Sequence, residues 1–247
     1  MTGPEDNKKI TAVIPTRAGS ERVKQKNIRK FGDSNLLELK IESMKRLKRS
    51  GVIDEIMLNS NCPVSMEIAS RHRIKIHERD DFLASSECDI REYWKECAKH
   101  ISTPHMLLAQ VTSPFISADT YVKCLKAYFN SNHDSLMTVK ELKEYIWKDN
   151  APLNYKWPQH PKSQNLPTNI HYLTFGVSII SKEVLAETGN LVGQNPLFYP
   201  VSQIEAVDID TEIDFQFAEQ LYHKTHAILH QPPPAMEEHE YFHGHGY

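Results

Sequence analysis

The chain has 247 residues, with 29 lysines and arginines against 32 aspartates and glutamates, and a formal net charge of −3. This length can bury a substantial core as one large domain or two small ones, and the near-neutral charge weighs against a nucleic-acid-binding protein, which normally carries a basic excess. No apolar run approaches the roughly 18 residues of a membrane span, and the polar residues 1–9 lack the apolar stretch of a secretion signal.

Strands alternate with helices along the chain. Apolar, β-branched runs predict strands at residues 10–15, 55–59, 74–77, 105–111, 135–140, 172–180 and 204–209. Helical spacing predicts helices between residues 36 and 51 and at 64–70, 89–101, 118–129 and 211–224. This alternation predicts an α/β fold with a mainly parallel sheet. Such sheets bind ligands beyond the carboxyl ends of their strands, so the loops after Pro15, Asn59 and Val111 are the first candidates for a site.

Residues 141–170 interrupt this alternation. The segment contains four prolines and two tryptophans, Trp147 and Trp157, and has no helical period. A surface excursion is one interpretation, but two tryptophans are costly to leave in water. We therefore expect an arm that packs on a second subunit, which predicts a homodimer.

The pattern of elements ends near residue 226. Three prolines begin at Pro232, and His243 and His245 stand among glycines. These histidines have no acidic or cysteine partner to complete a metal site, so we expect residues 226–247 to be a disordered tail.

The four cysteines are scattered and form no Cys-x-x-Cys pair: Cys62, Cys88, Cys97 and Cys124. Without histidine partners at short spacing they predict no zinc site. In a domain of this size they are typical of reduced thiols, so we expect a cytoplasmic protein.

The loop after the first predicted strand concentrates positive charge. Residues 16–30 contain six basic residues against one acid, Glu21. The basic residues are Arg17, Arg22, Lys24, Lys26, Arg29 and Lys30. A positive loop at the carboxyl end of a strand is suited to hold a triphosphate, although the charge alone equally fits a solvated basic loop. The spacing matches neither a dinucleotide fingerprint nor a Walker A loop. The small residues Ala18, Gly19 and Ser20 let a ligand approach backbone N–H groups.

Four segments of the chain form one ordered set of motifs. They are Ile14-Pro-Thr-Arg17-Ala-Gly19-Ser20 with Lys26-Asn27, Arg79 with Leu83-Ala84-Ser85, Gln110-Val-Thr112-Ser113-Pro114, and Val207-Asp208-Ile-Asp210-Thr-Glu-Ile-Asp214. In this order they resemble the CMP-N-acylneuraminate (CMP-sialic acid) cytidylyltransferases. That family usually reads I-P-A-R-x-G-S-K-x-(I/V)-P-x-K-N, L-L-Q-P-T-S-P and I-D-I-D-T-x-x-D. The resemblance covers roughly residues 10–222.

The resemblance implies a Rossmann-like nucleotide-diphospho-sugar transferase sandwich with an inserted dimerisation arm. It implies an enzyme that transfers CMP from CTP to a sialic-acid-like 2-keto sugar acid and releases pyrophosphate. The catalytic domain would span residues 1–225, with the arm at about 141–170. Catalysis of such an in-line transfer is mostly positioning of the phosphates and neutralisation of their charge.

The same resemblance suggests a role for each matching residue. Those with catalytic roles are Arg17, Lys26, Gln110, Asp208 and Asp210. Those that bind the nucleotide are Ala18, Gly19, Ser20, Asn27, Arg79, Ala84, Ser85 and Ser113. In the arm, Gln164-Asn165-Leu166-Pro167 is similar to the family's Q-x-L-P. Lys162 or His171 would then touch the sugar acid of the other subunit, although a core or surface role is favoured for each of them.

Asp208 and Asp210 are candidates for a metal site. Two residues apart on a predicted strand, their carboxylates face the same side, and paired carboxylates suit Mg²⁺. Position alone favours Asp210 as the N-cap of the last helix. The resemblance favours the metal, which leaves the cap to Thr211, spaced with Asp214 as a capping box.

Several positions depart from the family pattern. Glu21 and Arg22 replace Lys and Gly, Lys24 replaces Pro, Ser86 replaces Asp and Ile116 replaces Arg. Leu173-Thr-Phe-Gly176 stands where sialic-acid members have Arg-x-Asn-Gly, which removes partners for the polar groups of the sugar. The acceptor therefore stays open. A Kdo-type or other nucleotide-sugar pyrophosphorylase and a non-catalytic nucleotide-binding regulator are the alternatives.

Overall fold

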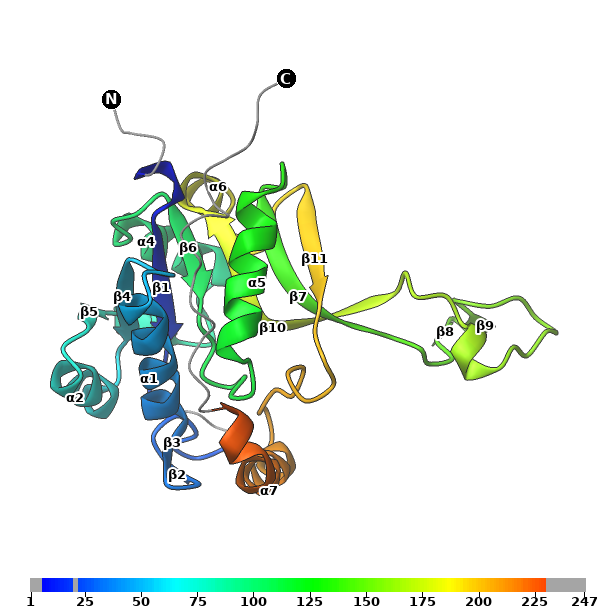
Figure 1. The fold of residues 1–247 in the computed structure, drawn as a ribbon, viewed down its shortest axis with the longest axis horizontal. Coiled ribbons are helices and arrows are strands. Elements are labelled where there is room, and N and C mark those ends of the chain that lie inside the picture. Colours follow the sequence, from blue (N-terminus) through cyan, green and yellow to red (C-terminus); the bar gives the residue numbers. More distant parts are fainter. Residues whose placement is uncertain (1–5, 20–21, 230–247) are drawn as a thin grey trace.

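The computed structural model describes residues 6–19 and 22–229, and the side chains up to residue 225. Ser20 and the predicted tail beyond residue 229, including His243 and His245, therefore lie outside the described residues. The rest of the chain forms a twisted sheet covered by helices, with one long excursion (Figure 1).

The sheet has seven strands in the order β11-β7-β10-β6-β1-β4-β5. They are β1 (Ile10–Pro15), β4 (Glu55–Ser60), β5 (Lys75–Glu78), β6 (His105–Leu108), β7 (Ser135–Glu141), β10 (His171–Ser181) and β11 (Pro196–Pro200). Strand β1 is parallel to β4 and β6, β4 to β5, and β11 to β7, whereas β10 is antiparallel to both of its neighbours. The prediction of an α/β fold with a mainly parallel sheet is confirmed.

Helices cover both faces of this sheet. The α-helices are α1 (Leu36–Arg49), α2 (Pro63–Arg71), α3 (Asp81–Ala84), α4 (Ile90–Lys99), α5 (Ala118–Phe129), α6 (Lys182–Thr188) and α7 (Glu212–Leu229). Strand β1 contributes side chains to both faces because successive residues of a strand point in opposite directions. Ile10, Ala12 and Ile14 belong to the large cluster with α1, α2, α5 and α7, whereas Val13 packs with α4 and α6.

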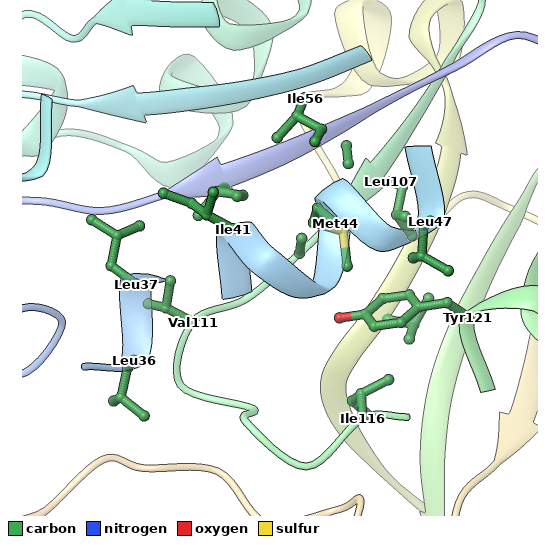
Figure 2. Packing of buried hydrophobic residues seen from close by; sticks show 14 of the residues in the cluster. Leu36, Leu37, Ile41, Met44, Leu47, Ile56, Leu107, Val111, Ile116 and Tyr121 are labelled. Atoms are coloured by element: carbon green, nitrogen blue, oxygen red, sulfur yellow. The ribbon is translucent and has the colours of Figure 1, made fainter. Parts of the chain in front are cut away.

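Helix α1 begins at a cap and buries one apolar stripe. The Asn35 side chain accepts a hydrogen bond from the Glu38 N–H, which satisfies one of the free donors of the first turn. Leu37, Ile41 and Met44 recur at helical spacing on the buried side, where Figure 2 shows them among residues of the strands and α5. The stripe ends at Leu47, and Gly51 with φ +71° follows the helix.

The prediction of a strand at residues 204–209 is wrong. The seventh strand is β11, which pairs with β7, while residues 201–211 form turns and a segment without regular secondary structure. Pro196 and Pro200 bracket β11 and hide its strand character in the sequence, yet proline is tolerated at a sheet edge, where β11 lies. Helix α6 was not predicted either, because its seven residues show little periodicity.

The segment between β7 and β10 projects away from the sheet as an arm (Figure 1). It contains the two-residue strands β8 (Trp147–Lys148) and β9 (Ala151–Pro152), joined by Asp149 and Asn150, which both have positive φ. Smaller elements elsewhere are the paired strands β2 (Lys30–Phe31) and β3 (Ser34–Asn35) and the 3₁₀ turns Asp6–Lys8 and Ser163–Asn165. No helix within the described residues is long and apolar enough to cross a bilayer.

Candidate functional site

A cavity opens beyond the carboxyl ends of β1, β5 and β6, where a mainly parallel sheet is expected to bind ligands. Its volume is about 270 Å³. It is lined by Pro15, Thr16, Arg17, Arg22, Val23, Lys26, Asn27, Arg79, Ile90, Tyr93, Trp94, Gln110, Val111 and Thr112. A neighbouring cavity of about 480 Å³ shares Arg17 and Asn27 with the first and adds Ala18, Gly19 and Lys24. The two cavities are adjacent, and residues of the loop after β1 and residues that follow β6 line them.

The six basic residues of the loop after β1 separate into groups with different surroundings. Arg17, Arg22 and Lys26 line the first cavity, and Lys24 lines the second. Arg29 instead makes two hydrogen bonds, of 2.8 and 2.6 Å, to the Glu212 carboxylate on α7, and its guanidinium lies 4.1 Å from the centre of the Phe215 ring. Arg29 therefore fastens the loop to α7. The cationic surface of the two cavities comes from Arg17, Arg22, Lys24 and Lys26.

Lys26 lies at the centre of the cationic surface. Its ammonium donates a 2.6 Å hydrogen bond to the Ile209 carbonyl and is 3.7 Å from the Asp210 carboxylate. Burial lowers the pKa of Lys26, while Asp210 and Asp208 act in the opposite direction. Arg22 pairs with the same Asp210 carboxylate at 3.2 Å. The loop after β1 and the segment before α7 thus form one charged wall.

Asn27 and Arg79 are buried polar residues on the cavity wall. The Oδ1 atom of Asn27 is buried without a hydrogen-bond partner in the described part of the chain. Arg79 donates through its Nη2 atom to the carbonyls of Thr16 and Asn59, and its guanidinium lies 4.4 Å from the centre of the Tyr93 ring. Arg79 thereby joins the ends of β1 and β4, and its buried Nε is also unpaired among the described residues.

The segment after β5 reaches the site through Arg17, whose guanidinium donates to the Ala84 carbonyl at 3.1 Å. Ala84 and Ser85 do not line either cavity. Ser85 is the C-cap of α3, and its hydroxyl donates to the Phe82 carbonyl at 2.7 Å. The structure therefore places this segment behind Arg17, close to the predicted site.

Gln110 and Ser113 differ in their exposure to the cavity. Gln110 lines it, together with Val111 and Thr112, whereas Ser113 is 1% exposed and does not. Gly19, predicted to admit a close ligand, has φ +75° and open space where a Cβ would stand. Beside it, the Ala18 N–H is already bonded to the Asn61 side chain at 2.9 Å.

Asp208 and Asp210 flank the buried Ile209 in an extended segment, which is not the strand that we predicted. The Ile209 N–H donates to the Thr112 carbonyl at 2.9 Å, and this bond holds the segment beside the end of β6. Burial, and the nearby Asp210 carboxylate, raise the pKa of Asp208, opposed by the Thr112 side chain and Lys26. The predicted capping box is present: Thr211 and Asp214 exchange hydrogen bonds, with the Thr211 N–H donating to Asp214 at 2.7 Å.

The carboxylate pair has the chemistry of a magnesium site. Oδ1 of Asp208 is buried and has no hydrogen-bond partner among the described residues, so it is an acceptor without a donor. No group of three or more histidines, cysteines or acidic residues within that part of the chain is suited to a metal ion. Mg²⁺ commonly uses only one or two carboxylates and completes its shell with phosphates and water, so the pair fits this ion.

Sequence reasoning missed Glu205, which fixes the segment that carries the carboxylates. One oxygen of Glu205 accepts hydrogen bonds from the Ser117 N–H, the Ser117 hydroxyl and the Thr120 hydroxyl, at 3.2, 3.0 and 2.5 Å. These groups belong to the first turn of α5, where a carboxylate is favoured by the helix dipole. Glu205 lies 85 residues from Thr120 in the sequence, so no local sequence pattern could predict that it caps α5.

Ile116, one of the positions that depart from the family pattern, packs into the protein interior, and so does Thr174 in the stretch 173–176. Ile116 is 4% exposed, and a Cβ on Gly176 would meet its Cδ1 atom at 2.7 Å. Thr174 is buried against Thr138 through a 2.8 Å hydrogen bond between their hydroxyls. Phe175 has φ +53° beside a register shift in β10. The stretch 173–176 is therefore built around an irregularity that brings Gly176 against Ile116.

Known proteins resemble this chain in sequence and in fold. An N-acylneuraminate cytidylyltransferase A of Danio rerio is 24% identical over 233 residues, which cover 89% of this chain and 52% of that protein. A pseudaminic acid cytidylyltransferase of Campylobacter jejuni is 23% identical over 231 residues, covering 88% of this chain and 98% of that protein.

Among solved structures, the 4-diphosphocytidyl-2C-methyl-D-erythritol synthase of Anaerococcus prevotii aligns with a TM-score of 0.65 at 16% identity. That alignment covers 88% of this chain and 99% of the other. This structural likeness concerns the fold alone. The chain spans about half the length of the Danio rerio relative. The family described as Cytidylyltransferase matches residues 11–238. The match extends over most of the chain, and the protein therefore belongs to the cytidylyltransferase family.

Proposed function

We propose that the protein transfers CMP from CTP to a sialic-acid-like 2-keto sugar acid, a nonulosonic acid, and releases pyrophosphate. The observation that carries this proposal is the charged wall at the carboxyl ends of the strands, where Arg17, Arg22 and Lys26 line a cavity beside Asp208 and Asp210. Cations supply the charge that a triphosphate needs, and the carboxylates supply oxygen ligands for its metal. Two relatives are cytidylyltransferases for N-acylneuraminate and for pseudaminic acid, and they suggest the acceptor class.

In this reaction the anomeric hydroxyl oxygen of the sugar acid attacks the α-phosphorus and loses its proton to solvent. The bond from that phosphorus to the bridging oxygen of the β-phosphate breaks, and pyrophosphate leaves. Arg17 and Lys26 hold the phosphate oxygens, which neutralises the charge that gathers on the leaving pyrophosphate. Asn27 supplies the unpaired Oδ1 acceptor and Arg79 the unpaired Nε donor, both buried at the wall. Gln110 lies at the end of β6, where it orients the nucleotide and the sugar.

Mg²⁺ belongs to this proposal, and Asp208 and Asp210 are the residues that would hold it. When bound, the ion neutralises phosphate charge and orients the triphosphate. Asp210 also pairs with Arg22 and Lys26.

The arm supports a proposal about assembly. Trp147 is 50% exposed, Leu153 58% and Trp157 73%, and all three lie on a projection with no layer of its own to cover them. Burying such side chains is favourable by about 25 cal/mol per Å². We therefore propose that the arm packs on a second copy of the chain. The four cysteines are free thiols, which suits the cytoplasm, the compartment that we propose.

The test is incubation of purified protein with each of the four nucleoside triphosphates, Mg²⁺ and a panel of keto-sugar acids that includes N-acetylneuraminic, pseudaminic and Kdo acids. The proposal expects pyrophosphate release with CTP and a nine-carbon acid, together with a CMP-sugar detected by mass spectrometry. Release only with another nucleotide, or only with Kdo, would assign the protein to another nucleotide-sugar pyrophosphorylase. CTP binding without turnover on any acid would make it a regulator.

A further inference from the structure

Lys40 lies on the core-facing side of α1 and is only 3% exposed. It shares that side with Leu37, Ile41 and Met44, and the ring of Tyr121 from α5 packs in the same cluster (Figure 2). Its amine is 3.0 Å from the Ser113 carbonyl oxygen and 2.9 Å from the Tyr121 hydroxyl oxygen. A lysine in the centre of an apolar helix face is unusual and calls for a physical reason.

The stability of the fold does not explain why a lysine is buried at this position. Removing an ammonium group from water is costly, and replacing a buried charge with an apolar side chain of similar volume is often neutral or stabilising. Burial lowers the pKa of Lys40 to about 7, because the apolar surroundings disfavour the charged form of its amine. The two hydrogen bonds persist in both protonation states, because a neutral amine can donate to the Ser113 carbonyl and accept from the Tyr121 hydroxyl.

The contacts of Lys40 lead to the candidate site. Ser113 ends the turn formed by residues 110–113, and the preceding Gln110, Val111 and Thr112 line the main cavity. The Thr112 carbonyl in the same turn accepts the hydrogen bond from the Ile209 N–H that holds the Asp208–Asp210 segment. A single turn therefore carries one wall of the cavity and one anchor of the carboxylate pair.

Lys40 supplies the short hydrogen bond at the end of that turn. The Ser113 N–H reaches the Gln110 carbonyl at 3.4 Å, which is long for a turn. The Ser113 hydroxyl is buried with no hydrogen-bond partner in the part of the chain that the structure describes. The 3.0 Å hydrogen bond from the Lys40 amine to the Ser113 carbonyl is shorter than the bond within the turn. It approaches the turn from the side opposite the cavity.

We propose that Lys40 is a positioning residue for nucleotidyl transfer, whose amine holds the 110–113 turn so that Gln110 and the Asp208–Asp210 segment meet the nucleotide in one geometry. This proposal rests on the proposed function, because positioning is defined by the reaction that it serves. Lys40 touches neither cavity, so it acts through the turn. Small displacements of groups around a phosphoryl transfer are sufficient to change its rate strongly.

The test compares Lys40→Met, which keeps the length and apolar stem of the side chain and removes both hydrogen bonds, with two controls. Lys48→Met removes an exposed lysine from the same helix. Tyr121→Phe removes the second partner and leaves the bond to Ser113. Each protein is assayed for kcat and KM with CTP, for thermal stability, and for amide hydrogen exchange in the absence of substrates.

For Lys40→Met we expect kcat to fall by about 10- to 100-fold with KM for CTP changed less than about threefold. The amides of Ser113 and Ile209 should exchange faster while those of β4 do not. Tyr121→Phe should lose less activity than Lys40→Met, and Lys48→Met should match the wild type.

Unchanged kcat and unchanged exchange at Ser113 and Ile209 would overturn the proposal. So would a loss of activity accompanied by faster exchange throughout the sheet, because that pattern shows a stability defect. If the wild type transfers no nucleotide and exchange nevertheless rises only around the turn, the proposed function fails while the structural part of this proposal holds.

Discussion

The Lys26 ammonium lies 3.7 Å from the Asp210 carboxylate and joins the loop after β1 to the segment before α7. Residues 26 and 210 are far apart in the chain, and their contact brings the cationic and the acidic parts of the candidate site together. A triphosphate with a divalent ion carries both kinds of charge, so this contact occupies the place where such a ligand is expected to bind.

Lys26→Met should lower kcat/KM for CTP by at least about 100-fold, because it removes a charge-assisted contact to the triphosphate. Steady-state kinetics of pyrophosphate release measure this effect. The matched control is Lys30→Met, which removes an exposed lysine from β2, where the loop ends. Equal losses in the two variants would mean that the loop acts through its general charge and that Lys26 has no specific role.

Breaking the contact between Arg29 and Glu212 should affect stability more than catalysis. The pair forms a two-bond contact between the loop and α7, so Arg29→Met should lower the free energy of unfolding by a small but measurable amount. Urea unfolding measures that change, and Lys24→Met is the control for loss of charge. A fall in kcat comparable to that of Lys26→Met would contradict the structural role of Arg29.

Replacing Trp147 and Leu153 with serine should convert a dimer into monomers without unfolding the body of the protein. The reason is that both side chains are at least half exposed on the arm of a single chain. Sedimentation equilibrium measures the mass of the assembly, and circular dichroism checks the fold. Phe217→Ser, which changes an exposed aromatic residue on α7, is the control. A wild-type protein that sediments as a monomer would contradict the proposed role of the arm.

Acid should weaken the contact between β5 and α4. The rings of His77 and His100 are stacked with their centres 3.6 Å apart, and the Asn59 amide lies 2.9 Å from Nδ1 of His77. Burial lowers the pKa of His77 from its usual value of 6.5, with His100 adding to the effect.

A lowered pKa means that the unfolded chain binds protons that the folded chain does not. The associated stability is therefore present above about pH 6.5 and lost as the pH falls toward the pKa of His77 in the folded protein. His77→Gln should reduce this acid-dependent loss. Urea unfolding at pH 7.5 and 5.5 measures the difference. An equal acid-dependent loss in wild type and variant would contradict the assignment to His77.

The sequence predicts most of the sheet because each central strand is a short apolar run of its own. The prediction fails at the sheet edge, because Pro196 and Pro200 make the sequence of β11 unlike that of a strand. It also fails at residues 204–209, because the alternating apolar residues there give the sequence pattern of a strand. In that segment Ile209 is buried and Asp208 and Asp210 flank it, so the alternation is real. The segment does not pair with a neighbouring strand, and a local sequence pattern does not show which strands will pair.

The candidate site is partly predictable for a similar reason. Clustered charge and motif spacing identify Arg17, Lys26 and Gln110, which the structure brings to one cavity. The surroundings of Arg29 depend on Glu212, and those of Lys40 on Ser113 and Tyr121, and all of these contacts are long-range. In the sequence of α1, Lys40 interrupts the apolar stripe, and this pattern predicts a residue at the edge of the buried face. Only the packed structure shows that its amine is enclosed.

The central claim is a metal-assisted transfer of CMP at the charged wall. Asp210→Asn tests it most directly, because this change removes one carboxylate charge and leaves the shape of the side chain. The measurement is CMP-sugar formation from CTP and the acceptor acid that the panel identifies, with thermal stability recorded alongside. We predict activity below about 1% of wild type with an unfolding temperature within a few degrees. A variant with wild-type turnover would contradict the account.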